Sequence, residues 1–188
     1  MAEMPNIAGK LGLSVDELPY YTTVCTRKQD LKMRIWRVLL RASASLHVFG
    51  KVQGIDATSF QRHKASRQYV LRVGYNFDDI KMTALVDCDS TAVIDVHFSL
   101  KQPHDTQIGW QVLTRNLEQL NTVVADKGYD WDALRNELRD AGVRPVIKHR
   151  EFYPLDKAHN ARHDEDIYHC RSLIEAIFYA LKRRFGET

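Results

Sequence analysis

Apolar residues recur at helical spacing near the start of the chain and at strand-like spacing further on. Residues 1 to about 26 show no strong periodicity and are expected to be irregular or weakly helical. One amphipathic, basic helix is predicted over residues 29–46. Strands are predicted over residues 51–56, 69–75, 81–86, 91–100, 122–126 and 143–147. The last strand contains Pro145, which cannot donate a ladder hydrogen bond, so it is expected near a sheet edge.

Further helices are predicted in the second half of the chain. They cover residues 105–120, 131–141 and 166–185, and the polar stretches 59–68 and 149–165 are expected to be irregular. Asp105 is a good helix N-cap, and Gly142 is placed to end the second of these helices. The apolar run at residues 122–126 is typical of a buried parallel strand. The order predicts an α/β fold in which antiparallel strands are followed by β-α-β crossovers.

Composition limits the class of protein. The chain has 188 residues, of which 44% are apolar, and this suits one domain with a short appendage. Its apolar runs are too short to span a bilayer, and its first residues lack the basic and apolar regions of a secretory signal. Cys25, Cys88 and Cys170 are odd in number and far apart, which favours reduced thiols in a cytoplasmic protein over a disulfide framework.

The distribution of charge indicates a polyanionic partner only weakly. The formal net charge is +3. Basic residues cluster at residues 27–41, 62–72, 144–150 and 182–184, while acidic residues crowd residues 126–140. Basic clusters that converge in the fold would suit a nucleic acid. Any single cluster is more simply explained as a solvated surface.

The last predicted helix carries a polar stripe beside its apolar face. At about 100° per residue, Tyr168, Arg171, Glu175 and Lys182 fall within roughly 60° of one another. The apolar residues on the adjacent face are Ile167, Ile174, Ile177, Phe178, Leu181 and Phe185. A carboxylate between cations on this shoulder could hold a metal ion beside an anionic substrate. Geometry alone favours ordinary surface charges, because polar stripes beside apolar ones are common on helices.

The spacing of this stripe resembles a known signature. Tyrosine, two residues, arginine, three residues, glutamate, six residues and lysine is the pattern of the DDE transposases of bacterial and archaeal insertion sequences, and the chain matches it at each position. The resemblance implies a ribonuclease H-like fold: a mixed sheet flanked by helices, with the first strand beside the strand that follows the first helix. We therefore expect a helical N-terminal appendage at residues 1–50 and a catalytic domain at residues 51–188. Similar transposases continue past the glutamate helix, so a C-terminal truncation is also expected.

The resemblance also implies a role for each site residue. Asp56, in Gly-Ile-Asp-Ala-Thr, and Asp126, in Ala-Asp-Lys-Gly-Tyr-Asp, would join Glu175 as the catalytic triad and as the metal ligands. The metal would be Mg²⁺ or Mn²⁺, because three carboxylates suit a hard cation that also binds a substrate phosphate. The residues implied to contact the DNA backbone near the cleaved bond are Tyr168, Arg171 and Lys182.

The activity implied by the resemblance is DNA transposition. Such an enzyme cuts transposon ends and joins them to target DNA, with no membrane involved, and a homodimer on the DNA is left open. Two alternatives remain open as well. One is a ribonuclease H-like nuclease that cuts without joining, and the other is an inactive transposase remnant that only binds DNA.

The aspartates have competing interpretations. Asp56 and Asp126 could each be a turn-forming residue that caps nearby backbone amides. Asp87 also ends a predicted strand, so it competes with Asp56 as the first metal ligand. Asp87 is explained by its own turn. We prefer Asp56, because the fold would place its strand at the centre of the sheet and because the Gly-Ile-Asp-Ala-Thr pattern resembles the first motif of the family.

A group of histidines gives a weaker signal. His159 and His163, with His149, His169 and Cys170 nearby, could suggest a structural zinc site. No paired cysteine motif accompanies them, however. A polar loop that is exposed or lies near DNA is therefore the preferred interpretation.

Overall fold

The computed structural model of the chain describes residues 9, 12, 14, 17–61, 68, 71, 72, 74, 79–101 and 103–185. The chain forms two compact units, residues 1–39 and residues 40–188. The helix α2 (Tyr21–Asp30) ends where Leu31 takes an extended backbone with ψ 120°, and α3 (Met33–Ala44) begins after this break. The prediction of one helix over residues 29–46 is therefore wrong. Within the described residues, no helix combines the length and the apolar composition needed to span a bilayer.

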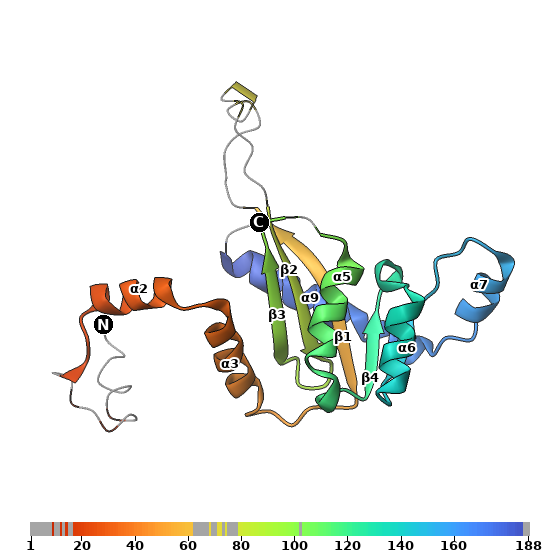
Figure 1. Cartoon of the computed structure of the whole chain (residues 1–188), viewed down its shortest axis with the longest axis horizontal. Coiled ribbons are helices and arrows are strands. Elements are labelled where there is room, and N and C mark those ends of the chain that lie inside the picture. Colours follow the sequence, from red (N-terminus) through yellow and green to blue (C-terminus); the bar gives the residue numbers. More distant parts are fainter. Residues whose placement is uncertain are drawn as a thin grey trace. The chain divides into compact units, whose positions relative to one another are not determined.

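The second unit is organised around a five-stranded sheet with the order β3-β2-β1-β4-β5 (Figure 1). Its strands are β1 (Val52–Phe60), β2 (Ile80–Asp87), β3 (Val93–Ser99), β4 (Thr122–Ala125) and β5 (Arg144–Ile147). The first three strands are antiparallel, and β4 and β5 run parallel to β1. The predicted α/β, ribonuclease H-like fold class is confirmed, with β1 beside β4 at the centre of a mixed sheet. The edge position predicted for the strand containing Pro145 is also confirmed.

The strand β1 is longer than predicted. It continues to Phe60 because β2 pairs with it as far as this last residue. The first two residues of the loop predicted over residues 59–68 therefore belong to β1, and residues 62–67 lie outside the described residues. The strand predicted over residues 69–75 lies largely outside the described residues, and Leu71 and Arg72 within it are helical.

One face of the sheet is covered by α5 (Asp105–Thr114) and α6 (Asp132–Asp140), as Figure 1 shows. Both helices contribute to the main core. Side chains buried in this core include Ile55, Leu85, Leu113, Leu134 and Leu138. Gly142, at φ +76°, follows α6 in the left-handed conformation that glycine favours, which confirms the predicted helix end.

The first of these helices differs from its prediction at both ends. The helix predicted over residues 105–120 stops at Thr114, and the chain continues as a short 3₁₀ helix, η2 (Leu117–Gln119). Its N-cap is His104, because this imidazole accepts a backbone N–H of the first turn. Asp105, the predicted N-cap, is instead the first helical residue.

The other face of the sheet is covered by the last helix, α9 (Arg171–Phe185), seen behind the strands in Figure 1. A second buried cluster forms there, made of Met82, Ala84, Val86, Val96, Ile174 and Phe178. Gly54 of β1 lets the helix approach closely, because a Cβ at this position would lie 2.3 Å from Cδ1 of Ile174. The first half of α9 is therefore held tightly against the centre of the sheet.

The stretch predicted to be irregular at residues 149–165 contains a helix, α7 (Pro154–Asn160). Proline is well suited to the first helical position, where its missing N–H is not needed. Asp156 accepts the backbone N–H of Tyr153, which satisfies a donor at the helix start. These local features start the helix without any apolar periodicity.

The single helix predicted over residues 166–185 is two helices. The first, α8 (Glu165–His169), is separated from α9 at Cys170. The backbone N–H groups of Cys170 and Leu173 bond three residues back, which tightens the chain between the two helices. Tyr168 therefore lies on α8, while the other three members of the polar stripe lie on α9.

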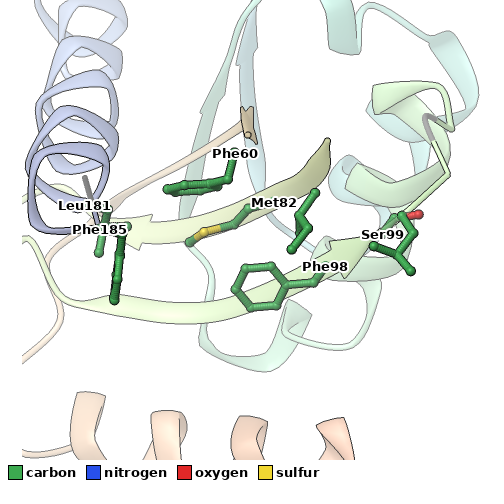
Figure 2. Close-up of a pocket in the computed structure, with 8 residues that line it drawn as sticks. Phe60, Met82, Phe98, Ser99, Leu181 and Phe185 are labelled. Atoms are coloured by element: carbon green, nitrogen blue, oxygen red, sulfur yellow. The ribbon is translucent and has the colours of Figure 1, made fainter. Parts of the chain in front are cut away.

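The end of α9 borders an apolar groove with a volume of about 520 Å³ (Figure 2). Its walls include Phe60, Met82, Phe98, Leu181 and Phe185. Figure 2 shows the α9 side chains turned toward the strand residues. Arg171 and Glu175 lie nearer the start of α9, away from this groove.

Candidate active site

Asp56 and Asp126 lie level with each other on neighbouring strands. β1 pairs with β4 in parallel, with Gly54 opposite Val124. Continuing this register by two residues brings Asp56 opposite Asp126, the residue that follows β4. Both side chains lie on the face covered by α9, because residues two apart on a strand share a face and Gly54 contacts that helix. The prediction that Asp56 ends its strand is wrong, since β1 continues beyond it.

Glu175 reaches the two aspartates from α9. Its neighbour Ile174 packs over Gly54, which is two residues before Asp56 on the same face. The charges of both Asp126 and Glu175 act on the pKa of Asp56. Three carboxyl groups that are far apart in the sequence are thus neighbours in the fold.

The chain after β4 holds Asp126 in a fixed position. The Oδ1 atom of Asp126 accepts the backbone N–H of Gly128 at 2.7 Å, which starts the short 3₁₀ helix η3 (Lys127–Tyr129). A Cβ on Gly128 would lie 2.7 Å from that oxygen, so a larger residue here would push the Asp126 carboxylate out of this position. Tyr129 is buried in the core and anchors the turn. Asp56 is fixed in a similar way, because its Oδ1 accepts the backbone N–H of Ala57 at 2.8 Å.

Arg171 lies among the three carboxyl groups. Its Nη2 is 3.0 Å from Oε1 of Glu175, one turn further along α9, and its Nη1 is 3.9 Å from Oδ2 of Asp126. The guanidinium therefore supplies positive charge where acidic side chains from two different elements meet. It connects the carboxylate of the helix to that of the sheet.

Burial raises the pKa of Asp56 to about 6. The negative charges of Asp126 and Glu175 contribute to this rise, while the amide of Ala57 and the charge of Arg171 oppose it. At neutral pH the ionised carboxyl is therefore held in a place that disfavours its charge. A cation bound beside Asp56 would relieve this repulsion.

Tyr168 lies next to the carboxylate group and contacts two cations. The Nζ of Lys148 lies 4.3 Å from the centre of the Tyr168 ring, and Cζ of Arg171 lies 5.8 Å from it. Lys148 also pairs with Glu165 at 2.8 Å. Sequence reasoning did not select Lys148. Its position directly after β5, the strand next to β4, is the signal that could have indicated it.

Lys182 is not part of the carboxylate group. It follows Glu175 by two turns, about 10.5 Å along the helix at 1.5 Å per residue. Its Nζ lies 5.9 Å from the ring centre of Phe60, the last residue of β1. Lys182 therefore extends the polar side of α9 away from the three carboxyl groups.

Asp87, the alternative candidate for the first metal ligand, accepts hydrogen bonds from the residues around its own turn. Its two oxygens accept hydrogen bonds from the amide of Gly50, the side chain of Gln53, and the amide and hydroxyl of Ser90. Burial acts to raise the pKa of Asp87, but these hydrogen bonds outweigh it and lower the pKa. The geometry of Asp87 is that of a structural residue, in contrast to Asp56.

The donor set of the carboxylate group fits a hard divalent cation. Its three side chains offer only carboxylate oxygens, which Mg²⁺ and Mn²⁺ prefer. Over the described part of the chain, no three His, Cys, Asp or Glu side chains converge tightly enough to hold one ion by themselves, the predicted histidine group included. Mg²⁺ is usually held by only one or two carboxylates, with water and substrate phosphate completing its ligands. Three carboxylates that are near one another without converging on one point are therefore compatible with Mg²⁺. A structural zinc site would need four protein ligands that converge on the ion.

A family model of the transposase DDE domain matches residues 49–188, which contain all the carboxylates described above. The chain belongs to the transposase DDE domain family. The predicted membership of the DDE transposases is therefore confirmed. No curated protein sequence gives a significant match.

Several solved structures resemble this DDE domain at low sequence identity. One is a simian T-cell lymphotropic virus intasome in complex with PP2A regulatory subunit B56 gamma, at 13% identity and a TM-score of 0.39, covering 62% of this chain and 38% of that chain. Another is the piggyBac transposase synaptic complex with hairpin DNA, at 15% identity and a TM-score of 0.44. The match covers 65% of this chain and 28% of that chain. A third is the catalytic core domain of BIV integrase, at 11% identity and a TM-score of 0.36. The match covers 65% of this chain and 79% of that chain. The chain thus spans well under two thirds of the first two proteins.

Proposed function

We propose that this chain is the catalytic part of an insertion-sequence transposase, which cuts transposon ends and joins them to target DNA with Mg²⁺ or Mn²⁺. The observation that carries the proposal is the meeting of Asp56, Asp126 and Glu175 beside Arg171, inside the segment matched by the family model. Action as a homodimer on DNA is part of the same proposal.

The proposed reaction consists of two displacements at phosphorus. In cleavage, the oxygen of water bonds to phosphorus while the bond to the 3′ oxygen breaks, which leaves a 3′-hydroxyl and a 5′-phosphate. In joining, this 3′-hydroxyl attacks a phosphodiester of the target, and the target's own 3′ oxygen departs. The attacking group loses a proton in each step and the departing oxygen gains one. When bound, the divalent ions supply activation of the attacking oxygen and stabilisation of the leaving oxygen.

The three carboxylates would hold the metal. Asp56 and Asp126 each commit one oxygen to a backbone amide, which fixes the side chain and leaves the second oxygen for a ligand. Glu175, whose side chain is 55% exposed, closes the group from the helix. Two fixed ligands and one exposed ligand suit a site that must admit a DNA strand.

The cations beside the carboxylates would bind the DNA backbone. Arg171 would contact the phosphate next to the cleaved bond, because it already sits between Asp126 and Glu175. Tyr168 would orient this guanidinium through its ring. Lys182 lies about 16.5 Å further along the helix than Arg171, so it would reach a phosphate roughly five steps away at 3.4 Å per step.

A cleavage assay with a duplex carrying the element's end tests this function. Nicked ends together with joined products in Mg²⁺ support the transposase. Nicks without joining would indicate a nuclease, and binding alone would indicate an inactive remnant. Glu175→Gln should abolish cleavage but retain folding and DNA binding, whereas Glu118→Gln, an exposed glutamate on η2, should leave cleavage unchanged. Undiminished cleavage by Glu175→Gln would remove α9 from the mechanism.

The insertion-sequence origin has a separate test. The genomic DNA around the coding region should carry inverted repeats, and these repeats should be the ends that the protein binds and cuts. Flanking DNA without such repeats would contradict the insertion-sequence assignment while leaving the chemistry of the site untouched. The mass of the complex between the protein and one such end would show whether a homodimer forms.

A further inference from the structure

A polar pocket lies beyond the carboxylates, at the β5 edge of the sheet. It has a volume of about 190 Å³, and its walls come from α6, from β5 and from the chain around α7. The basic side chains in these walls include Arg139, Arg144, Arg162, His149, His159 and His163. Asp164 is the acidic member of the same walls. Guanidinium groups therefore outnumber carboxylates there.

The outer guanidinium groups of this pocket are poorly neutralised. Arg144 faces Asp164 at 3.5 Å, and 58% of its side chain is exposed. Arg139 donates to the neutral side chain of Asn136 at 3.3 Å. Across the described ranges, no carboxylate forms an ion pair with Arg139 or Arg162. The pocket thus presents positive charge that its own acidic residue does not balance.

The nearby Asp130 cannot supply the missing negative charge. Its side chain binds Arg135, at the back of the pocket, at 2.6 Å, and it also accepts the backbone N–H of Arg150 at 2.7 Å. The Nδ1 atom of His149 lies 3.4 Å from the same carboxylate. Asp130 is therefore already committed to these three partners.

His163 lies in the wall of the pocket with its ring held in place. Its Nε2 lies 3.0 Å from the carbonyl oxygen of Ile147. Burial is the main cause that lowers the pKa of His163; the hydrogen bond to Ile147 opposes this shift, and the charges of Arg135, Lys148 and His149 act in the same direction as burial. The nearby cationic groups would also attract an anion.

One wall residue of the pocket, His163, lies close to Tyr168 of the candidate active site. The ring of His163 lies 6.1 Å from the ring of Tyr168. On the same tyrosine, Lys148 lies 4.3 Å and Arg171 lies 5.8 Å from the ring centre. A row of cationic groups therefore leads from the carboxylates, past Lys148, to the arginines of the pocket.

We propose that this pocket binds one phosphate group of the DNA backbone, on the strand that is cut at the carboxylates. The assignment rests on the proposed function. Planar guanidinium groups bind phosphate oxygens in a bidentate manner, so unpaired arginines favour this ligand over a neutral one. The pocket is also smaller than the roughly 300–1,000 Å³ that encloses a drug-sized ligand, which suits a single phosphate rather than a nucleotide.

The double substitution Arg139→Ala with Arg162→Ala tests the assignment. Fluorescence anisotropy of a labelled end duplex, measured at several salt concentrations, gives the slope of log affinity against log salt. Losing one phosphate contact should make this slope shallower by about 0.9. The charge-conserving pair Arg139→Lys with Arg162→Lys should retain most of the slope. Lys101→Ala, an exposed cation shortly after β3 at the opposite edge of the sheet, should match the parent protein.

The outcomes separate this pocket from the proposed function. Cleavage at saturating DNA is measured in parallel, to show separately whether the carboxylate site is active. A shallower slope supports the pocket even if no cleavage is found. An unchanged slope in a protein that cleaves would overturn the pocket and leave the transposase standing. Titration of the histidine resonances with inorganic phosphate identifies the remaining case: binding of free phosphate with an unchanged DNA slope would indicate a small-anion site and overturn the DNA assignment.

Discussion

Replacing Asp56 with asparagine should stabilise the metal-free protein at neutral pH. Burial raises the pKa of Asp56 from 3.8 to about 6, and Asp126 and Glu175 add to the rise. Between these pH values the folded chain keeps a proton that the unfolded chain has lost. The contribution of Asp56 to stability is therefore complete below about pH 4 and is lost as the pH rises through 6.

The size of the effect follows from the pKa of Asp56. The rise from 3.8 to about 6 is roughly 2 pKa units, or about 3 kcal/mol at 1.36 kcal/mol per unit. Asparagine keeps the shape of the side chain and the oxygen that accepts the amide of Ala57, but it carries no charge. The variant should therefore gain about 3 kcal/mol above pH 7, or about 6–12 °C in Tm for a chain of this size.

Unfolding by urea or heat in the presence of a chelator, from pH 4 to pH 8, measures this difference. The curves for Asp56→Asn and the parent should separate as the pH rises from 4 to 6 and stay apart above 7. Asp140→Asn, an exposed position at the end of α6, should follow the parent at every pH. Mg²⁺ at pH 7.5 should stabilise the parent by mass action but not Asp56→Asn. Curves that coincide over the whole pH range would refute the reasoning.

Three further sets of substitutions test how the site is built. Gly54→Ala would put a Cβ 2.3 Å from Cδ1 of Ile174, so it should destabilise the fold by about 1–3 kcal/mol and slow cleavage by displacing α9. Adding Ile174→Val should relieve both defects, and a fully stable and active Gly54→Ala would show that the close approach is unnecessary. Arg171→Ala and Lys182→Ala should each lower the salt slope of end binding by about 0.9, measured by anisotropy, and unchanged slopes would leave both as solvated surface charges. Tyr129→Phe removes a buried hydroxyl that has no hydrogen-bond partner in the described part of the structure, so thermal unfolding should show equal stability or a gain of up to about 1–3 kcal/mol. A clear loss of stability in that variant would reveal a partner for the hydroxyl.

The central strands and the position of Asp126 could be predicted from local sequence. A short apolar run followed by aspartate identified β4, because a strand covered on both faces has no polar alternation. The spacing of Arg171 and Glu175 placed both on one side of a helix, as their ion pair confirms. These features are local, so neighbouring residues were sufficient to indicate them.

Features that depend on distant pairing could not be predicted in the same way. β1 continues past Asp56 because β2 pairs with it there, and nothing in the residues after Asp56 indicates that partner. Lys148 becomes a neighbour of Tyr168 only because β5 lies beside β4. The helix α7 was missed for a different reason: it is held by its proline and its capping aspartate, and it has no apolar stripe.

The most direct test of the central claim is diffraction from crystals of the protein with Mn²⁺ and an end duplex, with anomalous signal used to locate the metal. The account predicts a Mn²⁺ peak bound by carboxylate oxygens of Asp56 and Asp126, with Glu175 beside it and a DNA phosphate among the ligands. A Mn²⁺ ion bound elsewhere, with these three carboxylates in contact only with Arg171 and the protein backbone, would contradict it.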